Sequence, residues 1–225
     1  MSFRTNAAPF VASMAIVVVA SNILVQFPVQ HTLGGLSLAD VLTWGAFTYP
    51  VAFLVTDLAN RRHGPAFARK VVFVGFMLAV ACSIIVPPLL FRAGLIEFET
   101  AAARLVRISM ASGAAFLVAQ LLDVTVFNWL RRQSWWRAPV FGSLAGSVVD
   151  TLLFFSIAFS AAFSFVGPDD AFALEAAPLF GVLPLEAARW LSWALGDLTV
   201  KLLIAVFALI PYRLIAARWR QPAIA

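Results

Sequence analysis

Six charged side chains lie inside long apolar stretches of the sequence, and they carry its clearest chemical signal. They are Asp57, Arg107, Asp123, Asp150, Asp197 and Lys201. A charge inside a bilayer is costly, so such residues usually face the interior of a helix bundle and mark a binding site or a pathway. Carboxylates and an ammonium group in that setting can pair with each other, accept N–H groups of a polar ligand or hold a proton.

Asp197 and Lys201 are four residues apart, and Trp193 precedes them at the same spacing. In a helix these three side chains share a face, which predicts an ion pair between the acid and the lysine. Such a pair could simply neutralise two buried charges. It could equally be a coupled site that a substrate or a proton disturbs, and both interpretations stay open at this point.

Two further helical faces combine polar and aromatic groups. At steps of three or four residues they present Ser109, Ser112, Phe116, Gln120, Asp123 and Phe127 in one segment and Gly142, Gly146, Asp150 and Phe154 in the next. Serine, glutamine and glycine at this spacing are also typical of close helix–helix packing. Packing alone does not require a carboxylate on each face, so we expect both faces to border a polar cavity.

The chemistry of these groups suits a flat, hydrogen-bonding heterocycle. Aromatic side chains can stack on its ring. A carboxylate can accept two N–H groups from a guanine-like edge, and the amides of Asn22 and Gln26 can pair with a carbonyl and a ring nitrogen. A sugar or amino-acid carrier could use the same groups, so several substrate classes remain open.

Asp57 is expected to have a different role from the other acids. It lies near the end of its apolar segment, beside Arg61 and Arg62. We expect it to form a structural cap or a salt bridge in a loop.

The elements that position these side chains are predicted to be transmembrane helices. The chain has 225 residues, of which 62% are hydrophobic and 12% charged, against roughly 45–50% apolar and 25% charged in soluble domains. The mean hydropathy is +0.93. This composition excludes a soluble enzyme, a secreted disulfide scaffold and a disordered chain, and it predicts an all-α polytopic membrane protein.

Six segments are long enough to cross the hydrocarbon, which takes about 20 apolar residues in a helix. They are residues 8–27, 43–60, 71–91, 104–130, 138–164 and 187–215. We therefore expect residues 1–225 to form one transmembrane domain, a bundle of six helices. Pro50 lies inside the second segment, and Pro87-Pro88 should kink or end the third. The first segment is too long for the core of a signal peptide.

The basic residues predict the orientation. Most of the 16 Lys and Arg residues lie in the N-terminal segment, in loops 61–70 and 131–137 and at the C-terminal end. In a six-span arrangement these four regions are on one side, whereas most acids lie in the opposite loops. Because cytoplasmic loops carry an excess of Lys and Arg, both termini are expected in the cytoplasm.

Several other chemistries lack their motifs. The chain has no P-loop, no H-E-x-x-H and a single cysteine, Cys82, so nothing predicts ATP hydrolysis, a metal site or a disulfide within the chain. We expect no enzyme activity and no cofactor. We attribute the net charge of +5 to cytoplasmic loops rather than to nucleic-acid binding.

A series of short motifs runs in order through nearly the whole chain. They are Ser21-Asn22, Val25-Gln26-Phe27-Pro28, Thr43-Trp44-Gly45-Ala46-Phe47, Thr56-Asp57-Leu58, Arg107-Ile108, Ala111-Ser112, Gln120-Leu121-Leu122-Asp123-Val124, Val126-Phe127-Asn128, Leu130-Arg131, Trp135-Trp136, Ala138-Pro139, Asp150-Thr151, Phe154-Phe155, Ile157-Ala158-Phe159 and Lys201. Together they resemble the queuosine precursor transporter family, also known as the vitamin uptake transporter family. Where the family pattern leads us to expect Gly-Asn, this chain has Gly146-Ser147.

The resemblance implies a carrier in the bacterial inner membrane that imports deazaguanine precursors of queuosine, the modified base of certain tRNAs. The implied substrates are 7-cyano-7-deazaguanine and 7-aminomethyl-7-deazaguanine. The expected partners are this small molecule, the lipid bilayer and, in a homo-oligomer, further copies of the chain, with no direct contact to nucleic acid.

A midplane cavity between the helices is the predicted substrate site. The side chains that we expect to bind substrate there are Asn22, Gln26, Trp44, Phe47, Arg107, Gln120, Asp123, Phe127, Asn128, Asp150, Asp197 and Lys201. Trp44, Phe47 and Phe127 would stack on the ring, and Asp123 or Asp150 would accept its N–H groups.

Two other functions fit the same sequence features. One is a substrate-binding membrane subunit of an energy-coupling-factor vitamin importer, an analogy that rests on the number of spans alone. The other is a membrane scaffold or assembly factor that transports nothing. The first would require partner proteins, and the second would bind no deazaguanine.

Overall fold

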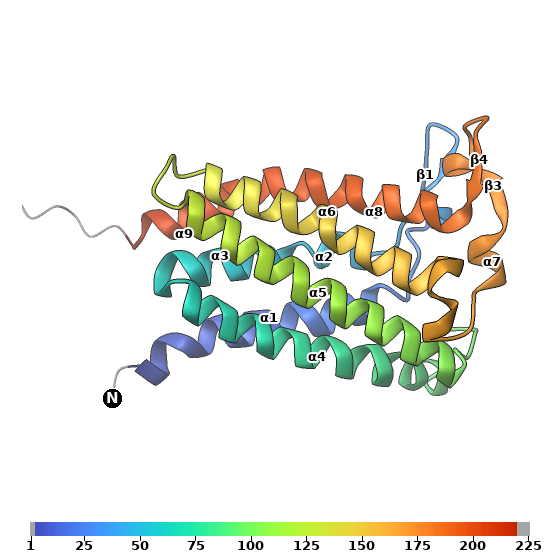
Figure 1. Ribbon diagram of the computed structural model, residues 1–225, viewed down its shortest axis with the longest axis horizontal. Helices are drawn as coiled ribbons and strands as arrows, with labels where there is room; N and C mark the ends of the chain where they lie inside the picture. The colour runs from blue at the N-terminus through green and yellow to red at the C-terminus, as the bar shows by residue number, and fades with distance from the viewer. Residues whose placement is uncertain (1–2, 220–225) are drawn as a thin grey trace, which may run out of the picture.

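The long helices lie side by side in an elongated bundle. The computed structural model describes residues 3–219, with side chains from residue 7 onward. The chain runs back and forth along the long axis (Figure 1). The long helices are α1 (Phe3–Leu24), α4 (Pro65–Arg92), α5 (Ala102–Leu130), α6 (Arg137–Phe159) and α8 (Arg189–Phe207).

Five segments of the described chain are long and apolar enough to cross a membrane. They are Ala7–Leu24, Pro65–Arg92, Ala102–Leu130, Arg137–Phe159 and Arg189–Ala217. Each coincides with one of the six spans predicted from the sequence. The chain is therefore a largely helical, polytopic membrane protein, and the segment that differs is residues 43–60.

Residues 43–60 form two helices rather than the single one expected. α2 (Gly45–Thr48) and α3 (Val51–His63) are separated by Tyr49 and Pro50. Pro50 has no N–H to donate, and the turn closes with short-range bonds from the Ala52 amide to the Tyr49 carbonyl (3.0 Å) and from Phe53 to Pro50 (3.1 Å). Neither helix alone has the length of a span.

The third predicted span does not end at Pro87-Pro88, because α4 continues through both prolines to Arg92. In a membrane helix, neighbouring groups can satisfy the backbone carbonyls that proline leaves free. One turn earlier, Ser83 Oγ donates to Asn22 Oδ1 of α1 at 3.0 Å, so this part of α4 is held against its neighbour. The other end points also shift, since α6 stops at Phe159 and the last segment divides into α8 and α9 (Leu209–Ala217).

Short elements gather in the loops at the end of the bundle away from the N-terminus (Figure 1). They include two small hairpins, Thr32–Leu33 with Leu36–Ser37 (β1, β2) and Ala176–Pro178 with Glu186–Ala188 (β3, β4). The others are the 3-10 helices η1 (Leu38–Asp40), η2 (Ala161–Val166) and η3 (Leu179–Gly181) and the short helix α7 (Ala171–Leu174).

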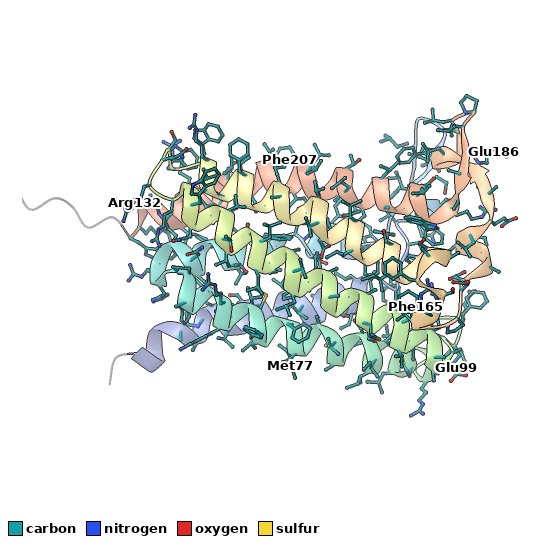
Figure 2. The ribbon with its side chains drawn as sticks, in the orientation of Figure 1. Met77, Glu99, Arg132, Phe165, Glu186 and Phe207 are labelled. Atoms are coloured by element: carbon teal, nitrogen blue, oxygen red, sulfur yellow. The ribbon has the colours of Figure 1, made fainter. Side chains whose placement is uncertain are left out.

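The outer surface of the bundle is apolar along its length and charged at its ends. Met77 and Phe207 point outward near the middle of the long axis, whereas Arg132 and Glu186 lie toward opposite ends (Figure 2). At the end that carries α9, Arg61 Nη1 donates to the Arg131 carbonyl at 3.1 Å. The two basic loops therefore meet at one end, as the charge pattern predicts.

Two glycines let α6 approach its neighbours closely. A Cβ on Gly146 would lie 2.5 Å from the Phe53 ring and 3.1 Å from the Ala119 carbonyl oxygen, and a Cβ on Gly142 would lie 2.5 Å from Asp123 Oδ1. The two distances of 2.5 Å are too short for a side chain. The spacing thus serves helix packing, as is typical of small residues at four-residue intervals in membranes.

We expect Gly146→Ala to destabilise the protein by about 1–3 kcal/mol, because the added methyl group forces Phe53 or the α5 backbone to move. Val148→Ile on the outward-facing side of α6 adds one carbon as well, without such a clash, and should leave stability unchanged. Denaturant unfolding of both variants in one detergent checks this. Equal stability of the two would contradict the packing.

Candidate functional site: a cavity above a buried charge cluster

A cavity of about 450 Å³ lies between the helices. Its lining includes Lys201 of α8 and, in the loops between helices, Asp40 of η1 and Thr100 just before α5. Its volume falls in the range of about 300–1,000 Å³ that is typical of small-molecule sites. The polar side chains that line it are Ser21, Asn22, Gln26, Asp40, Thr43, Tyr49, Ser83, Thr100, Ser112, Asp150, Asp197 and Lys201.

Lys201 occupies the deep end of this cavity and contacts two carboxylates. Its Nζ lies 2.6 Å from Asp150 Oδ2 and 2.5 Å from Asp197 Oδ2. Tyr49 donates its hydroxyl to Asp150 Oδ1 at 2.9 Å, and Thr151 donates to Asp197 Oδ2 at 3.0 Å. The side chains of Lys201 and Asp150 are each 4% exposed, so this ion cluster is nearly closed to solvent.

Sequence spacing explains how the cluster forms. Asp197 and Lys201 are one turn apart on α8, which puts them on one helix face, and their predicted ion pair is confirmed. Asp150 and Thr151 reach the same point from α6, whose glycines bring it close to its neighbours. Tyr49 arrives from the break between α2 and α3. The cluster therefore joins three parts of the chain that are far apart in sequence.

Asp197 is the carboxylate of the cluster that remains available to a ligand. Its side chain is 16% exposed, four times as much as that of Asp150. Both oxygens of Asp150 accept hydrogen bonds, but Asp197 Oδ1 has no hydrogen-bond partner within the described part of the chain. Two carboxyl groups share one ammonium group, so the cluster has more acceptor oxygens than Lys201 occupies, which favours a ligand rich in N–H groups.

Aromatic rings form one wall of the cavity. Phe155 and Phe159 stack at 5.8 Å between ring centroids, and Trp193 meets Phe159 edge to face at 5.3 Å. Trp193 Nε1 also donates to the Asp40 carbonyl at 2.9 Å, which fastens the ring to the η1 loop. Phe154 completes this wall, so a flat ligand could lie against rings while its edge meets polar groups.

Five of the predicted substrate-binding residues line this cavity. They are Asn22, Gln26, Asp150, Asp197 and Lys201. Asn22 is already engaged, since its amide donates to the Val18 carbonyl at 2.9 Å and accepts from Ser83. Gln26 has no side-chain hydrogen bond to any residue that the structure describes, which leaves its amide free for a ligand.

The other predicted residues do not line the cavity. Trp44 and Phe47 are 42% and 38% exposed and pack against each other. Phe127 is fully buried against Tyr212, and Gln120 accepts a 2.6 Å hydrogen bond from Thr56. Asn128 is exposed and accepts from Arg131 at 3.4 Å.

Arg107 fastens the loop after α6 rather than facing the cavity. Its guanidinium donates to Asp169 Oδ1 at 2.7 Å and to the carbonyls of Ile157 (2.8 Å), Ser160 (2.6 Å) and Gly167 (3.0 Å). It therefore neutralises a loop acid and does not line the cavity in which it was expected to bind substrate. Its position near the start of α5, close to the loop, explains the difference.

The expected role of Asp57 is wrong, and Asp123 lies beside it. Asp57 is 2% exposed and forms no salt bridge with Arg61 or Arg62, because its position on α3 faces α5 and α6. Asp123 is fully buried.

The aromatic wall was only partly visible in the sequence. Trp193 shares the helical face of Asp197 and Lys201, and Phe154 continues that of Asp150, so spacing could have placed both at the site. Phe155 and Phe159 lie in an apolar run in which nearly every residue is hydrophobic. Helical spacing does not separate them from lipid-facing rings, and the signal that marks them is their place in the family motifs Phe154-Phe155 and Ile157-Ala158-Phe159.

Comparison with known proteins places the chain in a family. The sequence model of the family described as "Putative vitamin uptake transporter" matches residues 43–215. The chain belongs to the vitamin uptake transporter family. The resemblance seen in its motifs is thereby confirmed, and nothing in this family assignment points to an enzyme.

Named relatives of this family member come from three bacteria. It is 36% identical over 204 residues to the "Queuosine precursor transporter" of Escherichia coli strain K12, covering 87% of this chain and 79% of the relative. It is 35% identical over 205 residues to the "Probable queuosine precursor transporter" of Haemophilus influenzae, with the same coverage. The relative of that name from Bacillus subtilis is 30% identical over 128 residues, 52% of this chain and 56% of the relative. No solved structure matches the fold of this chain.

We expect Lys201→Met to destabilise this vitamin uptake transporter family member by about 3–5 kcal/mol, because two buried carboxylates lose their counter-ion. Lys70→Met is a matched control, since Lys70 is the other lysine of the chain and is exposed. Its effect should stay within about 0.5 kcal/mol. Denaturant unfolding in detergent measures both changes, and equal stability of the two variants would contradict the charge cluster.

Proposed function

We propose that the chain imports queuosine precursors across the bacterial inner membrane, with 7-cyano-7-deazaguanine and 7-aminomethyl-7-deazaguanine as substrates. The observation that carries the proposal is the cavity itself, because a partly free carboxylate, a free amide and an aromatic wall meet in one space. The names of the relatives supply the substrate class. The chemistry of the cavity and the names of the relatives are independent lines of support.

A guanine-like edge matches the deep end of the cavity. It carries adjacent N–H donors, and Asp197 Oδ1 is the acceptor that is free to receive them. The Gln26 amide is free to pair with the ring carbonyl. Lys201 holds both Asp197 and Asp150 in place through its contacts with them, so the acceptor is positioned before the substrate arrives.

The aromatic wall suits the faces of the bicyclic ring. Each base has a π-face, and stacking on an aromatic side chain is worth about 1–3 kcal/mol in nucleic-acid complexes. In this account Phe154, Phe155 and Trp193 supply that surface instead of the expected Trp44, Phe47 and Phe127. The 7-substituent, a cyano or aminomethyl group, would point toward the open end.

The direction of import follows from the charged ends. Because the basic loops mark the cytoplasmic side, the termini lie in the cytoplasm and the cavity extends toward the outer face of the membrane. The structure would then correspond to an outward-facing state. Release inside requires the cluster around Lys201 to separate or shift, as in carriers that alternate access around a midplane site.

We expect Asp197→Asn to weaken uptake by about 10- to 100-fold, because hydrogen bonds to a charged group contribute about 1.5–3 kcal/mol. The assay feeds 7-cyano-7-deazaguanine to cells that cannot make it and measures queuosine in tRNA. The control is Glu99→Gln, an equivalent change at an exposed acid. Both variants must be present in the membrane in equal amount.

If the wild-type chain and Asp197→Asn take up substrate equally well, the proposed role of Asp197 in substrate binding is wrong. No restoration of queuosine by the wild-type chain would contradict the function itself. Uptake by the purified chain alone in liposomes would separate this carrier from a subunit that needs an ATP-driven partner. Stabilisation by a deazaguanine would count against a scaffold that binds no ligand.

A further inference from the structure

A second pair of carboxyl groups is buried in the half of the bundle that holds α9. Asp57 of α3 and Asp123 of α5 are 2% and 0% exposed, and their carboxyl groups are within hydrogen-bonding reach of each other. Neither side chain lines the large cavity. The pair therefore has no part in the substrate site described above.

Hydrogen bonds on both sides fix the two acids opposite each other. Thr56 Oγ1 donates to Gln120 Oε1 at 2.6 Å, and Asn60 Nδ2 donates to the Val124 carbonyl at 3.2 Å. These two contacts align α3 with α5. Asp57 lies between Thr56 and Asn60 on α3, and Asp123 lies between Gln120 and Val124 on α5. Their proximity is thus built into the packing of the two helices.

Few groups can compensate the charge of the pair. Ser143 Oγ lies 3.5 Å from Asp57 Oδ2, at the limit of a hydrogen bond, and the close approach of Gly142 leaves no room for a side chain beside Asp123. Within residues 7–219, no Lys, Arg or His forms a salt bridge with either acid. No described donor reaches either oxygen of Asp123, so a protonated Asp57 is the neighbour that can supply one.

The charged and titratable groups that face the pair from the packed elements are already engaged or neutral. Lys201 of α8 binds Asp150 and Asp197, and Arg61 donates to the Arg131 carbonyl. Tyr212 of α9 carries a phenol, a group that is uncharged in its ordinary state. Two desolvated carboxylates side by side repel strongly, so such a pair retains one proton between them.

A small crevice connects the pair with the cluster at the substrate cavity. Its volume is about 10 Å³, close to the minimum of about 10–15 Å³ for one water molecule. Asp57 and Lys201 both line it, and Lys201 lines the large cavity as well. The hydroxyls of Ser147 and Tyr212 also line the crevice, and both are buried without a hydrogen-bond partner among the described residues.

We propose that Asp57 and Asp123 form the proton-binding site of the carrier, separate from the substrate site and linked to it through this crevice. The inference rests on the proposed transport function and adds its energy source. A proton from the outer side reaches the cavity floor and passes through the crevice to a carboxylate oxygen, where an O–H bond forms. The same bond breaks when the proton leaves to water on the cytoplasmic side with each substrate. Nothing is oxidised or reduced, and no other reactant is consumed.

The test uses the full chain in liposomes with labelled 7-cyano-7-deazaguanine. Counterflow, measured at equal pH on both sides, reports binding and exchange, whereas an inward proton gradient reports coupling. We expect the wild-type chain to accumulate substrate by up to about 10-fold per pH unit at one proton per substrate, because each unit is a tenfold difference in proton activity. A pH dye inside the vesicles should record acidification as substrate enters.

Asp57→Asn and Asp123→Asn mimic the protonated acid, which can exchange substrate but cannot release a proton. Both should retain counterflow and lose accumulation. Asp57→Glu keeps a carboxyl group and should retain coupling, and Glu97→Gln, a change at an exposed acid, should behave as wild type. The counterflow of each variant shows that it is folded, and the dye measurement on the wild-type chain needs no variant.

Accumulation by both Asn variants to the wild-type level would overturn the proposal. So would a wild-type chain that accumulates substrate with a sodium gradient alone, or that leaves the internal pH unchanged. A wild-type chain without counterflow would instead overturn the transport function, and the proton site would fall with it.

Discussion

The contact of Lys201 with Asp150 and Asp197 is the interaction on which the interior of this molecule depends. In a bilayer, the cost of a buried charge is reduced only by a partner or by water, and here one ammonium group serves two carboxylates from α6 and α8. Tyr49 adds a third segment through its bond to Asp150. The position of this cluster sets the depth of the cavity and decides which polar groups a ligand meets.

The same constraint explains why the molecule has two acidic sites of different character. Around Lys201 the carboxylates are stabilised by a cation, and one of them keeps a free oxygen toward the cavity. At Asp57 and Asp123 no cation is in contact among the described residues, so a proton takes its place. Lys201 lines both the large cavity and the crevice beside Asp57, an arrangement that suits a carrier in which substrate and proton bind separately but influence each other.

Sequence alone predicted the membrane class, five of the spans and the ion pair of α8, because these depend on composition and on local helical spacing. It did not predict the break at Tyr49-Pro50, and it left open whether α4 ends or only kinks at Pro87-Pro88, since the effect of a proline depends on which neighbours can satisfy the freed backbone groups. Asp57 was misplaced for a related reason. Its sequence neighbours Arg61 and Arg62 suggested a loop contact, but helix packing turns it toward α5 and α6.

The most direct measurement of the central claim, that the cavity is the substrate site, is the labelling of a cysteine placed in it. Ser112 lines the cavity, and Ser112→Cys in a Cys82→Ala background would carry a single thiol. A membrane-impermeant maleimide added outside intact cells should label it, and 7-cyano-7-deazaguanine should slow the labelling. Leu185→Cys in the exposed loop at the same end should react at the same rate with and without the ligand. No labelling of the Ser112→Cys thiol from outside, or labelling unaffected by the ligand, would contradict the account.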